Sequence, residues 1–146
     1  MASSELGGGT TEALRVSILT QGPYLIVSIH TALDDSQMVR LQKELIDKVG
    51  RQRSRGIIVD VSTLDVLDSF ATNTLTQLAH AAHLRGAVTV IVGIAPEVAI
   101  AMVQLSLRMG LVHTELDLEE GLNWLDELTG AARDAAFIPS DGDDDY

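Results

Sequence analysis

Hydrophobic and polar positions along the chain follow two different periods, and each change of period marks the border between a strand and a helix. The first two apolar segments are rich in β-branched residues and are separated by a Gly-Pro turn, which predicts a hairpin. Two later segments are short and almost entirely apolar, as is typical of strands covered on both faces. The predicted strands, including a short fifth one, are 15–20, 24–29, 56–61, 87–92 and 111–114.

Between these strands, apolar residues recur every three to four positions, which predicts amphipathic helices. In the third helix, opened by a proline and ended by Gly110, Ala101 shares one face with larger apolar residues. Those residues are Val98, Met102, Leu105 and Met109. The predicted helices are 35–49, 68–85, 96–109 and a last one that begins at Asp117.

The order of these elements is ββαβαβα(β)α, so strands and helices alternate after the first hairpin. Such alternation predicts parallel strands joined by right-handed crossovers. The fold class is therefore α/β, with a mixed, mostly parallel β-sheet and helices packed against it.

Length and composition indicate one domain with less patterned ends. The chain has 146 residues, enough for a single domain of ordinary size. Residues 1–12 are small, polar and glycine-rich, and residues 131–146 end in an acidic stretch, so both are expected to be flexible. The folded domain is expected to span residues 13–130.

The charge and the absence of certain residues exclude several classes of function. A formal net charge of −11 argues against nucleic-acid binding and favours a basic protein partner. The chain has no cysteine, which excludes disulfides and thiol chemistry. It shows neither a secretory signal pattern nor an apolar run long enough for a membrane span. We therefore expect a cytoplasmic protein that does not enter a membrane.

Three carboxylates follow the strand predicted to lie at the centre of the sheet: Asp60, Asp65 and Asp68. Ligands of open α/β sheets bind at the carboxyl ends of strands, so these side chains could hold Mg²⁺ in a small enzyme. The alternative is that they close the strand, form a turn and cap a helix, all of which are common roles for aspartate.

Ser69 lies at the predicted start of the second helix, where serine is a common capping residue. No Gly-x-Ser-x-Gly motif surrounds it and no histidine is tied to it by a motif, so no catalytic residues are predicted. His80 and His83 are interpreted as surface residues, while His30 and His113 stand alone. No metal or cofactor is predicted, because phosphate-binding and zinc-binding motifs are absent.

Two stretches of the sequence resemble a known family. They are Gly56-Ile-Ile-Val-Asp-Val-Ser62 with Val66-Leu-Asp-Ser-Phe-Ala-Thr72, and Val92-Gly-Ile94 with Pro96-Glu-Val-Ala99. Together with the order of the elements, they resemble a STAS domain of the anti-sigma-factor antagonist group. The Asp-Ser-Phe-x-Thr motif is most similar to that of the single-domain scaffold proteins of bacterial stressosomes, the RsbS type.

This resemblance implies a non-enzymatic regulator in a stress-response pathway. It implies that Ser69 is phosphorylated by an RsbT-like serine kinase, which the scaffold holds until the modification releases it. It also implies assembly with RsbR-like STAS paralogues into a homo-oligomer or a large hetero-oligomer. Four neighbours of Ser69 are predicted to contact a partner, namely Asp65, Asp68, Phe70 and Thr72.

Two departures from the RsbR type favour the scaffold interpretation. RsbR-type proteins carry threonines at the equivalent of Ser69 and at a second site on the third helix, and they have an N-terminal sensory domain. Here the second site aligns approximately with Ala101, and only about a dozen residues precede the expected fold. Two alternatives stay open: a monomeric antagonist of the SpoIIAA type that binds one anti-sigma kinase, and the Mg²⁺ enzyme that uses Asp60, Asp65 and Asp68.

Overall fold

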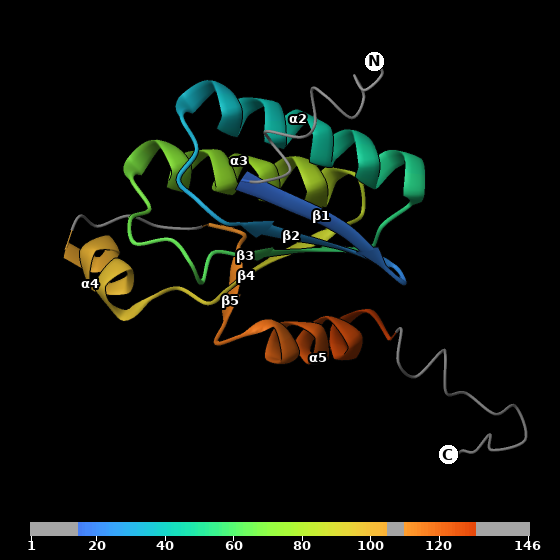
Figure 1. The fold of residues 1–146 in the computed structure, drawn as a ribbon. Helices are drawn as coiled ribbons and strands as arrows, with labels where there is room; N and C mark the ends of the chain where they lie inside the picture. The colour runs from blue at the N-terminus through green and yellow to red at the C-terminus, as the bar shows by residue number, and fades with distance from the viewer. Residues whose placement is uncertain (1–14, 105–109, 131–146) are drawn as a thin grey trace, which may run out of the picture.

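The computed structural model describes residues 15–104 and 110–130, which form one sheet with helices on both of its faces (Figure 1). The strands are β1 Val16–Gln21, β2 Tyr24–Ile29, β3 Gly56–Asp60, β4 Val88–Val92 and β5 His113–Glu115. The helices are α2 Asp35–Gln52, α3 Ser69–Leu84, α4 Pro96–Gln104 and α5 Leu118–Thr129. The predicted flexible ends, 1–12 and 131–146, and the predicted helical positions Leu105 and Met109 lie outside the described residues.

The sheet has the order β1-β2-β3-β4-β5, and only the β1–β2 pair is antiparallel. The predicted hairpin is confirmed: Gln21 pairs with Tyr24, and Gly22 turns the chain with a φ of 58°. This left-handed conformation suits glycine, which has no Cβ to clash with the backbone. The predicted α/β class with a mixed, mostly parallel sheet is confirmed.

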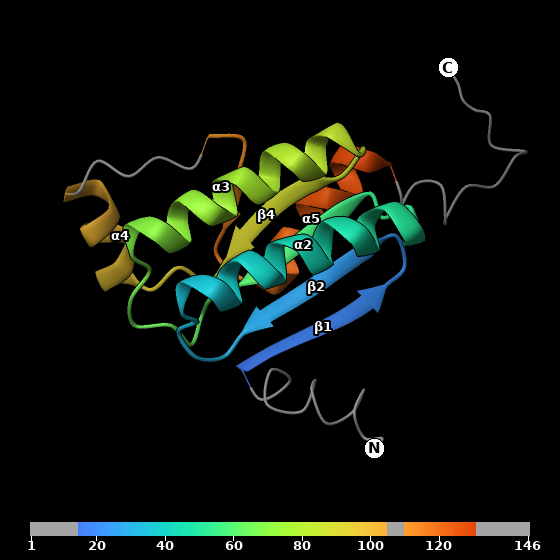
Figure 2. The same cartoon turned by 90° about the horizontal axis from the view of Figure 1, so that it is seen from above.

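Side chains of the central strand alternate between two hydrophobic cores. Ile57 and Val59 point into the larger core under α2 and α3, whereas Ile58 points into the smaller core under α5. Figure 2 shows α2 and α3 side by side over one face, with α5 behind the sheet. The central strand is therefore covered on both faces, as its continuous apolar run predicts.

Aspartates begin three of the helices. The side chains of Asp34, Asp68 and Asp117 each accept a hydrogen bond from a backbone N–H of the first helical turn. For α2 the bonds are reciprocal, because the Gln37 side chain also accepts the N–H of Asp34, at 2.9 Å. The described helices are too short or too polar for any of them to cross a membrane.

Two predicted details differ from the structure. In α4, Val98 and Met102 are buried but Ala101 is exposed, because the helix contacts the core along a narrow stripe only. The last strand is His113–Glu115 rather than 111–114, because its pairing with β4 begins at His113.

Candidate functional site

Ser69 is the first residue of α3 and its side chain is exposed. It follows β3 by a short loop, residues 61–68, at the carboxyl end of the parallel strands. The start of α2 lies at the same end, because α2 follows β2, which runs parallel to β3. The sequence prediction placed Ser69 at or beside this helix start, and the structure confirms that location.

The loop before Ser69 is held by buried leucines and by bonds to the strands on both sides. Leu64 and Leu67 are 6% and 7% exposed and pack into the larger core. The Thr63 hydroxyl donates to the carbonyl oxygen of Ile29 at 3.1 Å, while the Val61 N–H donates to the Val92 carbonyl oxygen at 3.1 Å. Ser69 therefore directly follows a loop that is anchored in the core, and its own side chain is exposed.

Asp68 caps the helix that begins with Ser69. Its Oδ1 accepts the N–H of Ala71 at 2.8 Å, and its carbonyl oxygen accepts the N–H of Thr72 at 2.9 Å. The bond to the side chain satisfies one of the four amides that a helix start leaves without an intrahelical partner, and the bond to the carbonyl oxygen is the first regular bond of the helix. The positive end of the helix dipole thus lies directly at Ser69.

The predicted partner-binding residues fall into two groups. Asp65, Asp68 and Phe70 are exposed, Phe70 by 38%, so a partner can reach them. Thr72 is 0% exposed and its hydroxyl has no hydrogen-bond partner. The prediction that Thr72 contacts a partner does not agree with this burial, because the first turn of α3 rotates its side chain into the core.

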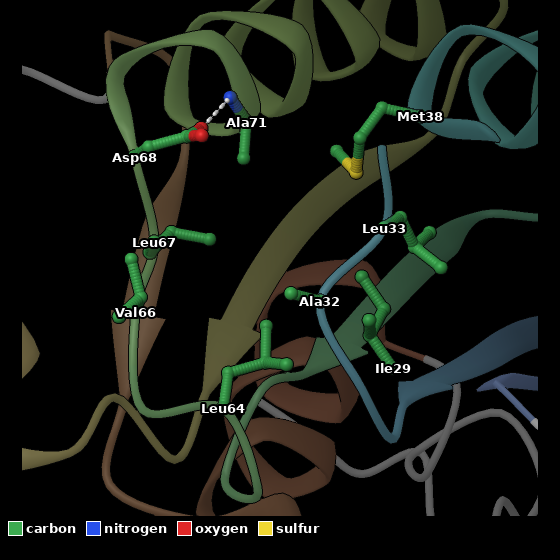
Figure 3. Close-up of a pocket in the computed structure, with 9 residues that line it drawn as sticks. All are labelled: Ile29, Ala32, Leu33, Met38, Leu64, Val66, Leu67, Asp68 and Ala71. Carbon is green, nitrogen blue, oxygen red and sulfur yellow. Dashed lines mark hydrogen bonds between the residues drawn. The ribbon is translucent and has the colours of Figure 1, made fainter. Parts of the chain in front are cut away.

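A small apolar pocket of about 50 Å³ opens beside this helix start (Figure 3). Its lining comes from the end of β2, the loop between β2 and α2, the start of α2, the loop before α3 and the first turn of α3. Asp68 is its one charged lining residue. The lining residues are Ile29, Ala32, Leu33, Met38, Leu64, Val66, Leu67, Asp68 and Ala71.

The three carboxylates of the Mg²⁺ alternative do not form a metal site. Asp60 accepts the N–H of Ser62 at 2.9 Å, and Asp68 caps α3. Within residues 15–104 and 110–130, no three His, Asp or Glu side chains are grouped so that they could hold a metal ion. In the described part of the chain the three carboxylates are therefore not grouped as the Mg²⁺ alternative requires, and the structure agrees with the structural roles proposed for Asp60 and Asp68.

The histidines are placed partly as predicted. His80 and His83 are exposed on α3, as expected. His30 and His113, which belong to no sequence motif, have partners in the fold: His30 Nε2 lies 2.8 Å from the Ser17 hydroxyl, and His113 has two partners. His113 stacks on Trp124 with ring centroids 3.7 Å apart, and its Nε2 lies 2.5 Å from a Glu115 carboxylate oxygen.

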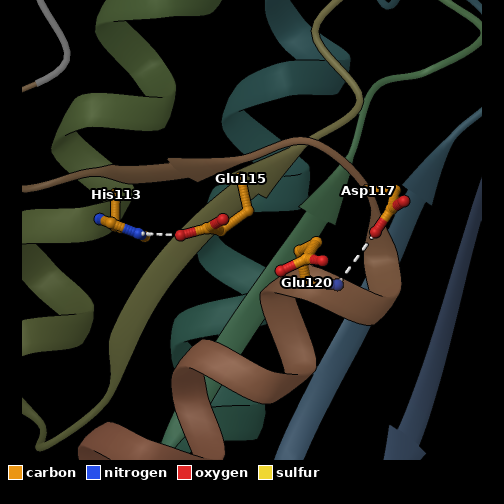
Figure 4. A network of polar contacts seen from close by, with 4 residues as sticks. All are labelled: His113, Glu115, Asp117 and Glu120. Carbon is orange, nitrogen blue, oxygen red and sulfur yellow. Dashed lines mark hydrogen bonds and ion pairs between the residues drawn. The ribbon is translucent and has the colours of Figure 1, made fainter.

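Figure 4 shows the His113–Glu115 contact on β5 beside the cap of α5, where Asp117 accepts the N–H of Glu120 at 2.9 Å. Residues two apart in a strand point to the same face, which brings the imidazole and carboxylate together. The contact joins the edge strand to the last helix through Trp124, on the face of the sheet opposite α2 and α3. It is structural and lies apart from Ser69.

Asp34 is a second charged cap at the end of the sheet where Ser69 lies. The N–H of Gln37 and the hydroxyl of Ser36 donate hydrogen bonds to its carboxylate and hold its pKa below the ordinary value. Asp34 is therefore ionised at neutral pH. With Asp65 and Asp68 exposed nearby in the fold, this end of the sheet is acidic.

Comparison with known proteins agrees with this architecture. A family model of the STAS domain matches residues 15–121, most of the chain. The chain belongs to the STAS domain family. The resemblance inferred from the sequence is thus confirmed.

Two solved structures of the stressosome type are similar to the chain. A serine-to-glutamate variant of Moorella thermoacetica RsbS is 34% identical, with 79% of this chain and 97% of that chain covered and a TM-score of 0.68. A structure titled as the molecular architecture of the stressosome, a signal integration and transduction hub, is 29% identical, covers 77% and 97%, and has a TM-score of 0.62.

Two further proteins are less similar. The RsbT co-antagonist protein RsbRA of Bacillus subtilis (strain 168) is 28% identical over 97 residues, which are 66% of this chain and 35% of RsbRA. The chain thus spans about a third of the length of that curated relative. The unphosphorylated anti-sigma factor antagonist SpoIIAA is 13% identical with a TM-score of 0.61, covering 79% and 96%, and shares the fold.

Sequence reasoning missed the apolar part of this site. Val66 is 64% exposed between the buried Leu64 and Leu67, and the start of α2 contributes Met38 to the pocket. The spacing of Leu64, Val66 and Leu67 contained part of the signal, because a valine between two buried leucines points away from them. The contribution of α2 depends on tertiary packing and has no local signal.

Proposed function

We propose that this STAS domain is a non-enzymatic scaffold subunit of a cytoplasmic stressosome-type, partner-switching pathway. It holds an RsbT-like serine/threonine kinase and releases the kinase when Ser69 is phosphorylated. It assembles with RsbR-like STAS paralogues and with copies of itself.

The position of Ser69 carries this proposal. Its side chain is exposed at the first position of α3, directly after the loop that Leu64 and Leu67 anchor in the core. A kinase can reach such a serine without unfolding the helix. Because the loop ends are fixed, a change at Ser69 alters the surface rather than the fold.

A phosphate on Ser69 would change the electrostatics of this surface strongly. It adds a charge of about −1.5 to −2 and three acceptor oxygens. The amides and dipole at the start of α3 would partly stabilise that charge, so the fold should survive. Asp65 and Asp68 flank the site in sequence, and the additional charge would repel them and any acidic part of a partner.

The surface around Ser69 has the composition of a protein-binding patch. Exposed Val66 and Phe70 lie among the carboxylates of Asp65 and Asp68. Apolar contacts with Val66 and Phe70 would supply affinity, while the acidic rim would favour a basic face on the kinase. We assign partner binding to these four residues and leave Thr72 out because it is buried.

The relatives support the same pathway. RsbRA is named as a co-antagonist of RsbT, and the 29% identical structure belongs to a stressosome. The RsbS structure is 34% identical, against 28% for RsbRA, which supports the RsbS type.

Phosphate transfer tests the site. The protein is mixed with an RsbT-like kinase and ATP, and phosphate incorporation is measured by mass spectrometry. We expect one phosphate on the wild type and none on Ser69→Ala, with Ser62→Ala as a control because Ser62 is an exposed serine of the same loop. Incorporation into Ser69→Ala at the wild-type rate would rule out Ser69 as the site.

Assembly is tested separately by measuring the mass of the protein mixed with an RsbR-like paralogue. A large hetero-oligomer is the expected result. A stable monomer in every mixture would instead support the one-to-one antagonist of the SpoIIAA type.

A further inference from the structure

A group of exposed arginines lies at the end of the sheet opposite Ser69. Arg53 ends α2, Arg55 directly precedes β3, and Arg85 ends α3 three residues before Val88, where β4 begins. Because β3 and β4 are parallel, these positions meet at the amino ends of the strands. The Val88 N–H donates to the Arg55 carbonyl oxygen at 3.1 Å, which joins the start of β4 to the residue before β3.

We call Arg53, Arg55 and Arg85 the basic end. Among residues 15–104 and 110–130, no carboxylate forms an ion pair with any of the three, and all are exposed. The Arg85 side chain crosses α2 at Gly50, where an added Cβ would lie 2.0 Å from Arg85 Nη2. The Arg85 guanidinium therefore lies beside the last turn of α2.

Helix C-termini favour basic residues, which explains why arginines are found here. The Asp126 carboxylate also lies at this end of the sheet, but it bonds to the Tyr24 hydroxyl. Three guanidinium groups that form no ion pair with a described carboxylate make a surface suited to a cluster of carboxylates.

The last described helix, α5, finishes at the same end of the sheet as the basic end. Leu125 of α5 packs over Gly56 at the start of β3, where an added Cβ would lie 2.8 Å from Leu125 Cδ1. The Tyr24 hydroxyl donates to Asp126 Oδ1 at 2.6 Å, so the final turn of α5 lies over the start of β2. Figures 1 and 2 show the C-terminal ends of α2, α3 and α5 at the same side of the sheet.

The chain that continues beyond Gly130 is acidic. Residues 131–146 contain five aspartates and one arginine, and four of the aspartates are Asp141, Asp143, Asp144 and Asp145. Asp141 is eleven residues beyond Gly130, a stretch that spans at most about 36 to 40 Å. The carboxylates can therefore reach the basic end of their own chain.

We propose that the acidic segment 141–145 binds in cis to the basic end. Two observations favour this segment as the ligand of the basic end: its charge is opposite to that of the arginines, and Gly130 lies at the same end of the sheet. Tethering to the domain also gives the segment a high effective concentration at the arginines. An acidic surface of another protein would have to displace it. The inference stands independently of the function proposed for Ser69.

The absence of cysteine provides a direct test. A nitroxide spin label is attached to the single cysteine of Gly142→Cys, which leaves every charge of the segment unchanged. At about 0.1 M salt, the nitroxide should remove most of the NMR intensity of the backbone amides of Arg53, Arg55 and Arg85. The intensity should recover at about 1 M salt, where the Debye length falls to roughly 3 Å. Amides of Asp65 and Ser69 at the opposite end serve as the reference.

Two matched variants in this background identify the charges. Replacing the four aspartates with asparagine, or the three arginines with glutamine, should each restore the signals at low salt. Unchanged signals at low salt, or signal loss that survives both variants, would overturn the proposal. So would loss seen only when spin-labelled and isotope-labelled chains are mixed, because that result would place the contact between two molecules.

Discussion

At the carboxyl and amino ends of the parallel sheet, helices α2 and α3 carry residues of opposite charge. The helix-starting residues Asp34 and Asp68 lie with Ser69 at the carboxyl end, while Arg53 and Arg85 lie at the amino end, where helices finish. Helices α2, α3 and α5 all start at the carboxyl end of the sheet and finish at the amino end, so their dipoles point the same way (Figures 1 and 2). Ordinary helix capping thus separates charge along α2 and α3, whereas α5 has no basic residue in its last turn.

The two ends differ further in how they are closed. At the amino end, α5 covers the start of β3 and the Tyr24 hydroxyl bonds to Asp126 and Thr129. At the carboxyl end, Val66 and Phe70 are exposed. An acidic surface with uncovered apolar groups is suited to a regulated protein contact, which capping alone does not explain.

The largest expected effect concerns the charge at Ser69. Ser69→Asp should weaken kinase binding by about 2 to 5 kcal/mol, or roughly 30-fold to several thousand-fold, because it adds a carboxylate to an acidic interface. Ser69→Asn is the control of equal size without charge. Titration calorimetry with an RsbT-like kinase measures both variants, and equal affinities for them would argue against an electrostatic switch.

Removal of the cap at Asp68 should cost less. Asp68→Ala leaves the Ala71 amide without its partner, so the free energy of unfolding should fall by about 0.5 to 2 kcal/mol. Asp65→Ala, at an exposed loop position, should stay within about 0.5 kcal/mol of the wild type. Denaturant unfolding measures both variants. An equal decrease in the free energy of unfolding would show that the cap contributes no more than an exposed loop aspartate.

Tyr24→Phe tests the closed amino end. Loss of the hydroxyl bonds to Asp126 and Thr129 should lower the free energy of unfolding by about 0.5 to 1.5 kcal/mol. Burial, and then the bond to Asp126, raise the pKa of Tyr24 above 10.0. Its contribution is therefore complete below pH 10.0 and is lost as the pH rises through the raised value.

Unfolding measured at neutral and alkaline pH checks this sign. The wild type should lose stability above pH 10.0, and the difference from Tyr24→Phe should shrink there. A difference that grows with alkaline pH would contradict the assignment.

The smallest effect is expected at Thr72. Thr72→Val removes a buried hydroxyl that has no partner, so stability should stay constant or rise by up to about 1 kcal/mol. Thr89→Val is the matched control, because the Thr89 hydroxyl is also buried and unpartnered. Kinase affinity should be unchanged for both. A selective loss of affinity in Thr72→Val would restore Thr72 to the partner surface.

Most of the fold could be predicted from local pattern. The apolar run at 56–61 and the helical spacing after Ser69 specify elements whose borders lie within a few residues of the observed ones. The helix caps could be predicted equally well, because an aspartate directly before a helix accepts a backbone N–H of its first turn. Ala101 was misplaced because the width of a buried stripe depends on what packs against it.

The site was only partly predictable for the same reason. The position of Ser69 follows from its cap, yet the burial of Thr72 and the contribution of Met38 to the pocket arise from helix–helix packing. The partners of His113 required knowledge of how β5 and α5 meet, since Trp124 is eleven residues away in sequence. Phosphorylation of Ser69 rests on the family resemblance and on no local physical signal.

The most direct test of the central claim measures kinase affinity of the same protein before and after phosphorylation. Full-length protein is phosphorylated stoichiometrically at Ser69, and its binding to an RsbT-like kinase is compared with that of the unmodified protein. We predict tight binding that is lost on phosphorylation, while the far-UV circular dichroism spectrum stays unchanged. Equal affinity of the two forms would contradict release of the kinase by phosphorylation.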